Sequence, residues 1–127
     1  MGAALRIDNK GRDKLLVSEG WSALGFWARL RGLLFCPPLL PGQGLWIMPC
    51  NWIHTLGMRS AIDVLYLDRE GRVLHVASEM HPNRLGPLVW RARSVVELPA
   101  GTIDSTGTTV GDQLEIAWAR QGEVERV

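Results

Sequence analysis

The sequence predicts an α+β fold: a mostly antiparallel, strongly curved or barrel-like β-sheet with one main helix in the N-terminal half. Two observations predict the sheet: short apolar runs recur along the 127 residues, and turn-forming residues separate them. A third observation, the helical spacing of apolar residues after Ser22, predicts the helix. With 46% hydrophobic and 21% charged residues, the whole chain, residues 1–127, is expected to form a single globular domain.

The first third of the chain is expected to supply a hairpin and then the helix. Apolar runs at residues 3–7 and 14–17 flank the turn-rich stretch 8–13, which is typical of a hairpin. Ser22 is a suitable N-cap for a helix that extends to about Leu34, where two prolines follow within four residues and end it.

The remainder of the chain reads as strands joined by turns. We expect these strands at residues 45–48, 62–67, 72–77, 94–98 and 114–118. The pair 62–67 and 72–77, joined by the turn Asp68-Arg-Glu-Gly71, is the clearest hairpin. Residues 78–91 contain two prolines and a glycine, so we expect a long surface loop there. Residues 99–111 are turn-rich.

Charge and hydropathy exclude several classes of function. Fourteen basic residues against thirteen acidic ones give a net charge of +1, which predicts no nucleic-acid partner, because that affinity needs clustered cations. The chain has no apolar stretch of the roughly 20 residues that a spanning helix needs, and no signal-peptide pattern. We therefore expect a cytoplasmic monomer or weak dimer without a membrane partner or a cofactor. Cys36 and Cys50 are expected to be two thiols rather than a disulfide.

Four sets of residues carry a family resemblance. They are Arg31-Gly-Leu-Leu34, Ile53-His-Thr-Leu-Gly-Met-Arg59 with Ile62-Asp63-Val and Asp68, Val96-Glu-Leu-Pro-Ala-Gly101, and Val110-Gly-Asp112. In order and spacing the chain resembles the bacterial and archaeal family called domain of unknown function 192, over about residues 23–116. The resemblance implies a compact, β-rich domain and brings no established activity, substrate or cofactor. The chain departs from the family at Leu34, where Met is common, and at Ser60 and Ala61, where an aromatic residue or proline is common.

Asp63 is the first candidate for a functional residue. Strand alternation places it on the same face as Leu65 and Leu67, and one face of residues 62–67 must be the core. A buried carboxylate must be paired or accept several hydrogen bonds, for which Arg59 or the backbone N–H groups of residues 55–58 are candidates. Asp63 then either fastens the preceding loop to the strand or serves as a catalytic or ligand-binding carboxylate.

Cys50 and His54 form a second candidate site. Their spacing of four places both on one side of a helical turn, where thiolate and imidazole can act as two metal ligands. Further ligands would come from His75, His81, Cys36 or a carboxylate, and none of these lies at a recognisable zinc spacing. A Cys–His nucleophilic pair and a buried thiol beside a hydrogen-bonded histidine are the alternatives.

Thr55, Gly57 and Arg59 are candidates for ligand binding. They precede the strand in a loop whose N–H groups, hydroxyl and guanidinium suit an anionic group, and Arg84, Arg91 and Arg93 can extend that surface. The alternative is that these arginines cover apolar surface and meet nearby carboxylates. Three of the six tryptophans, Trp46, Trp52 and Trp90, fall in or beside loops, where they either pack at the rim of the core or stack on a ligand.

These candidates leave three classes of function open. The first is a small, non-enzymatic binding or accessory domain that holds an unknown ligand or protein partner with the loop and strand start 51–63 and the nearby loop 80–93. The second is a hydrolase or transferase in which His54 is a general base or metal ligand and Asp63 orients it or acts as the carboxylate. The third is a structural partner of another protein, which predicts an exposed apolar patch that includes Trp46, Trp52 or Trp90.

Overall fold

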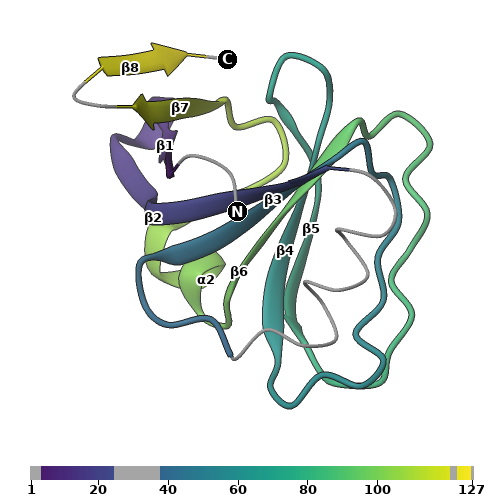
Figure 1. Ribbon diagram of the computed structural model, residues 1–127. Helices are drawn as coiled ribbons and strands as arrows, with labels where there is room; N and C mark the ends of the chain where they lie inside the picture. The colour runs from purple at the N-terminus through teal and green to yellow at the C-terminus, as the bar shows by residue number, and fades with distance from the viewer. Residues whose placement is uncertain (1–3, 25–37, 121–122, 127) are drawn as a thin grey trace.

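A single strongly curved sheet organises the fold, as Figure 1 shows. The computed structural model describes residues 4–24, 38–120 and 123–126. Its elements are β1 (Leu5–Asn9), the 3₁₀ helix η1 (Lys10–Arg12), β2 (Lys14–Leu24), β3 (Gln43–Met48), β4 (Ile62–Leu67), β5 (Val73–Met80), β6 (Ser94–Pro99), α2 (Thr102–Thr106), β7 (Leu114–Arg120) and β8 (Glu123–Arg126). The strand order is β5-β4-β6-β3-β2-β1-β7-β8. The described part of the chain is therefore mostly strand, as expected.

Neighbouring strands are antiparallel with the exception of β2 and β3, which run parallel. In that parallel pair Gly20 lies opposite Gly44. A Cβ atom at Gly20 would stand 2.7 Å from side-chain atoms of both Leu5 and Val17, and one at Gly44 would stand 2.5 Å from Val17. The two glycines thus leave room for the Leu5 and Val17 side chains where the hairpin β1–β2 joins the rest of the sheet.

Two apolar clusters lie on opposite faces of β4 and β6. The inner core is formed by residues from seven strands and α2: Leu5, Ile7, Leu16, Val17, Trp46, Leu65, Leu67, Val73, Val96, Leu98, Ile103, Leu114 and Ile116. The outer core combines strand residues with residues of the segments that follow β3 and precede β6: Ile47, Cys50, Ile53, Ile62, Val64, Tyr66, Ala92 and Val95. All six residues of β4 are buried. The sequence indicated that one face of residues 62–67 is core, and the structure shows that both faces are covered.

The hairpin predictions are confirmed. β1 pairs with β2, and β4 pairs with β5, in both cases antiparallel. Residues 62–67 and 94–98 fall within β4 and β6, and residues 45–48 and 114–118 lie inside β3 and β7. The predicted loop at residues 78–91 begins later than expected, because β5 continues to Met80 before the chain leaves the sheet.

The predicted helix is corrected at its start. Residues 22–24 end β2 and pair with residues 46–48 of β3, so Ser22 is a strand residue and not an N-cap. Residues 25–34 of the predicted helix lie outside the described part of the chain. Among the described residues the α-helix is α2, a five-residue segment in the C-terminal half, inside the stretch that the sequence marks as turn-rich.

Candidate functional site

Asp63 is fully buried on the inner-core face of β4, and three backbone N–H groups surround its carboxylate. Glu79 N donates to Oδ1 at 2.8 Å. Gly101 N and Ile103 N donate to Oδ2 at 3.1 and 2.8 Å. The carboxylate thereby fastens the end of β5 and the start of α2 to β4, whereas the sequence suggested that it fastens the preceding loop to the strand. Its partners differ from the expected ones, since Arg59 is exposed and residues 55–58 bond elsewhere.

Thr55 is also fully buried, and it joins two loops. Its hydroxyl donates to His81 O at 2.6 Å and accepts from Arg84 N at 2.9 Å. Its main chain donates to Arg84 O and accepts from Asn83 N, both at 2.9 Å. Thr55 therefore has a positioning role, because its hydrogen-bonding groups are engaged within the chain.

Residues 49–61 and 81–93 form one unit, which we call the loop pair. The two segments run side by side, as Figure 1 shows at the right of the view, and backbone hydrogen bonds join them. Gly86 N bonds to Ile53 O at 2.9 Å, Val89 N bonds to Asn51 O at 3.0 Å, and Gly57 N bonds to the Asn83 side chain at 2.9 Å. Ile53 and Ala92 pack in the outer core beneath. The loop pair is therefore anchored to the sheet along its length.

Gly86 shows how closely the loop pair is packed. A Cβ atom there would stand 2.9 Å from the Tyr66 hydroxyl and 3.0 Å from Ile53 O. The Tyr66 hydroxyl in turn donates to Pro87 O at 3.0 Å. A side chain larger than hydrogen would separate the two segments, because the backbone oxygen cannot move aside without breaking the bond to Gly86 N.

Cys50 and His54 lie in this loop pair, but not on a helical turn. Residues 50–54 are extended, with Cys50 N bonded to Arg93 O and His54 in an isolated antiparallel bridge with Leu85. The buried Cys50 thiol donates to Trp52 O at 3.0 Å, and His54 Nδ1 accepts from Leu56 N at 3.2 Å. Within the described ranges no group of three or more His, Cys, Asp or Glu residues is placed to hold a metal ion. A metal at Cys50 and His54 would need further ligands from elsewhere, and Cys36 lies outside those ranges.

The three candidate tryptophans have different environments. Trp46 is 4% exposed in the inner core, and its ring lies 6.0 Å from that of Trp118. Trp52 is 40% exposed, and its indole N–H donates to Gly86 O at 2.9 Å. Trp90 is 81% exposed, so the interpretation of Trp90 as a core or rim residue is wrong.

The arginines of the loop pair are exposed and have no carboxylate partner among the residues that the structure describes. Arg59, Arg84, Arg91 and Arg93 all lie at the surface. In the part of the chain that the structure describes, the ion pairs are Arg6–Asp8, Lys10–Glu115 and Arg12–Asp112, and none of them involves the loop pair. The alternative that these arginines meet nearby carboxylates is therefore wrong for the described residues. Residues 49–61 and 81–93 contain no Asp or Glu at all.

Glu97 is a buried acid that the sequence analysis did not single out. It lies on β6 opposite Val64 of β4 and Leu45 of β3, and it is 2% exposed. Burial raises the pKa of Glu97 to about 8, and its Oε1 has no hydrogen-bond partner among the described residues. Burial, with the nearby Cys50 and Glu97, raises the pKa of Tyr66 to about 12. The alternation of residues 94–98 was the available signal, because it places an acid among apolar residues.

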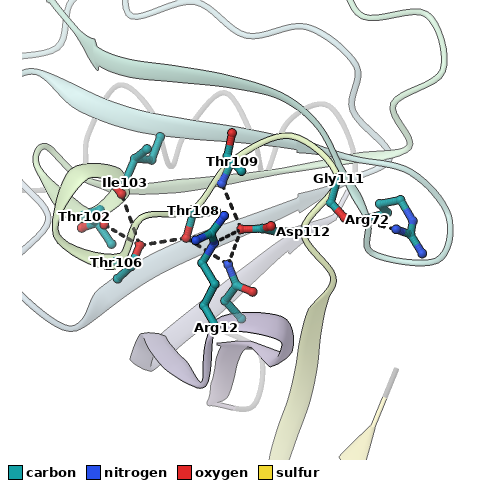
Figure 2. Close-up of polar contacts among 10 residues, drawn as sticks. Arg12, Arg72, Thr102, Ile103, Thr106, Thr108, Thr109, Gly111 and Asp112 are labelled. Carbon is teal, nitrogen blue, oxygen red and sulfur yellow. Dashed lines mark hydrogen bonds and ion pairs between the residues drawn. The ribbon is translucent and has the colours of Figure 1, made fainter.

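Asp112 organises a polar cluster away from the loop pair, at the turn before β7. Figure 2 shows Arg12 and Thr109 directed at its carboxylate. Arg12 Nε, Asn9 Nδ2 and Thr109 N donate to Oδ2 at 2.6, 2.9 and 3.0 Å. Although partial burial opposes ionisation, these hydrogen bonds lower the pKa of Asp112. The bond from Thr109 N lies within the turn that contains Asp112 itself. We call Asn9, Arg12, Thr108, Thr109 and Asp112 the Asp112 cluster.

The sequence of this chain also matches the model of a known protein family. The family model DUF192, described as an uncharacterized ACR, matches residues 9–116. The chain therefore belongs to the domain of unknown function 192 family, and the match begins earlier than the region that carried the resemblance in the sequence.

Known relatives and a solved structure agree with this assignment. A UPF0127 protein of Pyrococcus furiosus is 31% identical over 117 residues, which cover 88% of this chain and 97% of the relative. A UPF0127 protein of Thermococcus sibiricus is 28% identical over 112 residues, which cover 84% of this chain and 71% of the relative. A crystal structure of a protein of unknown function from Novosphingobium aromaticivorans has a TM-score of 0.73 at 19% identity, covering 88% of this chain and 83% of the other. At that identity the structural likeness concerns the fold alone.

Membrane insertion through a helix has no support in the described residues. None of the helices there combines the length and the apolar character that crossing a bilayer requires.

Proposed function

We propose that the chain acts as a non-enzymatic binding or accessory domain that recognises its ligand or partner with the loop pair. One observation carries the proposal: five of the eight large apolar side chains that are exposed in the described structure lie in the loop pair. They are Trp52, Leu56, Leu85, Leu88 and Trp90. Exposed apolar residues gathered in one region mark interaction sites, because a protein gains no stability from leaving them in water. Trp52 and Trp90 are among them, as the third class of function predicts, so the observation favours a protein as the partner.

The backbone of the loop pair supports the same proposal. Hydrogen bonds and outer-core contacts hold its main chain, so the side chains at its surface are pre-positioned and binding costs little ordering entropy. In this arrangement Thr55, Gly57 and Asp63 are positioning residues. Trp52, Gly57 and Arg59 are the exposed residues among the ligand-binding candidates, and because Gly57 has no side chain and its N–H bonds to Asn83, Trp52 and Arg59 supply the side chains that can touch a ligand.

The hydrolase or transferase alternative has less support from the geometry. A catalytic carboxylate must reach a substrate or a histidine, whereas the Asp63 oxygens are fully buried and accept three backbone hydrogen bonds. His54 Nδ1 already accepts the Leu56 N–H, so Nε2 is the ring nitrogen that remains for contact with a substrate.

Site-specific photo-crosslinking in cells tests the proposal. A benzophenone amino acid replaces Trp90 or Leu88 in the loop pair, and replaces Val110 or Leu15 in matched variants, because these four side chains are all exposed. We expect discrete crosslinked products from the loop-pair positions and none of comparable yield from the matched positions. Equal yields from all four positions, or none from Trp90 and Leu88, would contradict the proposal.

A further inference from the structure

The segment 84–90 presents its most apolar side chains outward. Leu85 is 67% exposed, Leu88 is 50% exposed and Trp90 is 81% exposed. Between them, Gly86 and Val89 are partly buried, and their N–H groups bond to Ile53 O and Asn51 O. Pro87 is exposed, and its carbonyl oxygen accepts the Tyr66 hydroxyl. The segment therefore behaves like one strand of a ribbon, with one side joined to residues 51–55 and the other side open at Leu85.

The main chain of Leu85 lies on that open side. Thr55 N bonds to Arg84 O and Gly86 N bonds to Ile53 O, so the bridge between His54 and Leu85 is a non-hydrogen-bonded antiparallel pair. In such a pair the N–H and C=O groups point away from the partner strand. Among the described residues no group bonds to the Leu85 main chain. An extended segment of another chain can pair with such an edge.

The charge of the loop pair indicates the chemistry of the partner segment that would bind at this edge. Its four arginines are the only formal charges in residues 49–61 and 81–93, which leaves ten basic and thirteen acidic residues in the rest of the chain. None of the four guanidinium groups is in an ion pair within the described structure. Arginine forms two parallel hydrogen bonds to a carboxylate, so acidic side chains are matched partners.

We propose that the open edge at residues 84–90 binds an extended acidic peptide segment of a partner protein, with apolar residues between its acidic ones. This inference rests on the proposed function and adds the chemistry of the partner. The peptide main chain pairs at Leu85, its apolar side chains contact Leu88 and Trp90, and its carboxylates meet Arg84, Arg91 and Arg93. Four cations are few for a nucleic acid, whose affinity comes mainly from neutralised phosphates. A lipid surface makes no use of an open main-chain edge.

Fluorescence anisotropy with a labelled twelve-residue peptide, in which Glu alternates with Leu and Phe, tests the inference. We expect saturable binding that weakens at least about tenfold in Trp90→Ala, in Leu85→Ser and in the double variant Arg91→Glu/Arg93→Glu. Replacing the peptide's Glu residues with Gln should remove the salt dependence and most of the binding. N-methylation of alternate peptide amides should also weaken binding, because it removes main-chain donors.

Matched controls separate this result from general effects. Arg69→Glu changes an exposed arginine in the β4–β5 turn, and Val110→Ala truncates an exposed apolar residue, so both should bind like the unmodified protein. Absence of peptide binding, or binding that the loop-pair variants leave unchanged, would overturn the inference. So would an unaffected N-methylated peptide.

Two parallel measurements distinguish failure of this inference from failure of the proposed function. Sedimentation with phosphatidylserine vesicles and anisotropy with a single-stranded oligonucleotide should both show no binding. If either shows binding that Trp90→Ala abolishes while the acidic peptide does not bind, the peptide inference is overturned and the loop pair remains the binding surface. If no probe binds and Trp90 yields no crosslinks in cells, both proposals fail.

Discussion

The Asp112 cluster and the loop pair use polar side chains in opposite ways. In the Asp112 cluster an arginine, an asparagine and a backbone N–H converge on one carboxylate oxygen, and Asn9 also bonds to Thr108. In the loop pair most hydrogen bonds are made by the backbone, and the side chains that take part are those of Cys50, Trp52, His54, Thr55, Tyr66 and Asn83. Four arginines and two tryptophans remain exposed, and of these Trp52 alone makes a side-chain hydrogen bond within the described residues.

This difference separates a stabilising region from a region available for recognition. Polar groups that satisfy one another inside the chain contribute to stability and have little capacity left for a ligand. Exposed groups without internal partners contribute little to stability, so changes to them are expected to affect binding and leave folding intact. Each of the following predictions tests that separation.

The largest expected effect comes from removing an internally satisfied carboxylate. Asp63→Ala leaves one buried and two partly buried N–H groups without an acceptor, so we expect a loss of about 4 kcal/mol in the free energy of unfolding. Urea titration followed by tryptophan fluorescence measures it, and Asp63→Asn, which keeps one acceptor oxygen, serves if the alanine variant does not fold. Asp104→Ala removes an exposed acid from α2 and should cost less than about 0.5 kcal/mol. Equal losses of unfolding free energy in Asp63→Ala and Asp104→Ala would contradict the prediction that the buried carboxylate stabilises the fold.

The second prediction concerns the pH dependence that Glu97 imposes. Its pKa is about 8 in the folded protein and near its ordinary 4.5 when unfolded, so the folded state keeps the proton longer. Stability therefore declines as pH rises from about 4.5 to about 8, by about 3 kcal/mol between pH 5 and pH 8, and is level above that range.

Glu97→Gln should remove most of this slope, as urea titrations at three pH values would measure. Asp112→Asn is the matched control and should keep the slope, because the pKa of Asp112 is lowered and it titrates below this window. An unmodified protein whose stability is flat from pH 5 to pH 8 would contradict the buried, protonated state of Glu97.

The third prediction addresses the Asp112 cluster directly. Asp112→Ala removes the acceptor of Arg12, Asn9 and Thr109, so we expect a loss of about 2 kcal/mol at neutral pH. The lowered pKa of Asp112 means that its contribution is present above its unfolded pKa, near 3.8, and is lost as pH falls through its lower folded pKa. Glu19→Gln, which neutralises an exposed acid on β2, should cost less than about 0.5 kcal/mol. A neutral effect of Asp112→Ala would show that the cluster does not stabilise the fold.

The smallest expected effect is in the loop pair. Trp90→Ala should change the free energy of unfolding by less than about 0.5 kcal/mol, because the ring is 81% exposed. Trp46→Ala is the matched truncation in the inner core and should cost about 4 kcal/mol. Thermal and urea unfolding of both variants gives the contrast, and comparable losses would show that Trp90 supports the fold.

Much of the sheet could be predicted from sequence because strand signals are local. The alternation at residues 114–118 and the apolar run at residues 62–67 lie inside β7 and β4, and the turn at residues 68–71 joins β4 and β5 as expected. Ser22 was misread because its cap chemistry and the apolar residues after it favour a helix locally, whereas pairing with β3 keeps residues 22–24 in β2.

The candidate site was located more accurately than it was interpreted. The sequence indicated a binding surface at residues 51–63 and 80–93, and these segments include most of the loop pair. It assigned contact roles to Thr55, Gly57 and Asp63, although Thr55 and Asp63 are buried and Gly57 N bonds to Asn83. Leu85 and Leu88 were missed, because no residue type signals in advance that a leucine will be exposed.

By itself, the sequence determined the positions of most strands, the family and the need of Asp63 for internal partners, because these depend on residue types and spacings along a short stretch of chain. Only the tertiary structure decided which groups meet. Asp63 accepts hydrogen bonds from Gly101 N and Ile103 N, which lie 38 and 40 positions further along the chain. The two buried faces of β4, the unmatched arginines and the exposure of Trp90 also depend on distant segments, so no local pattern could specify them.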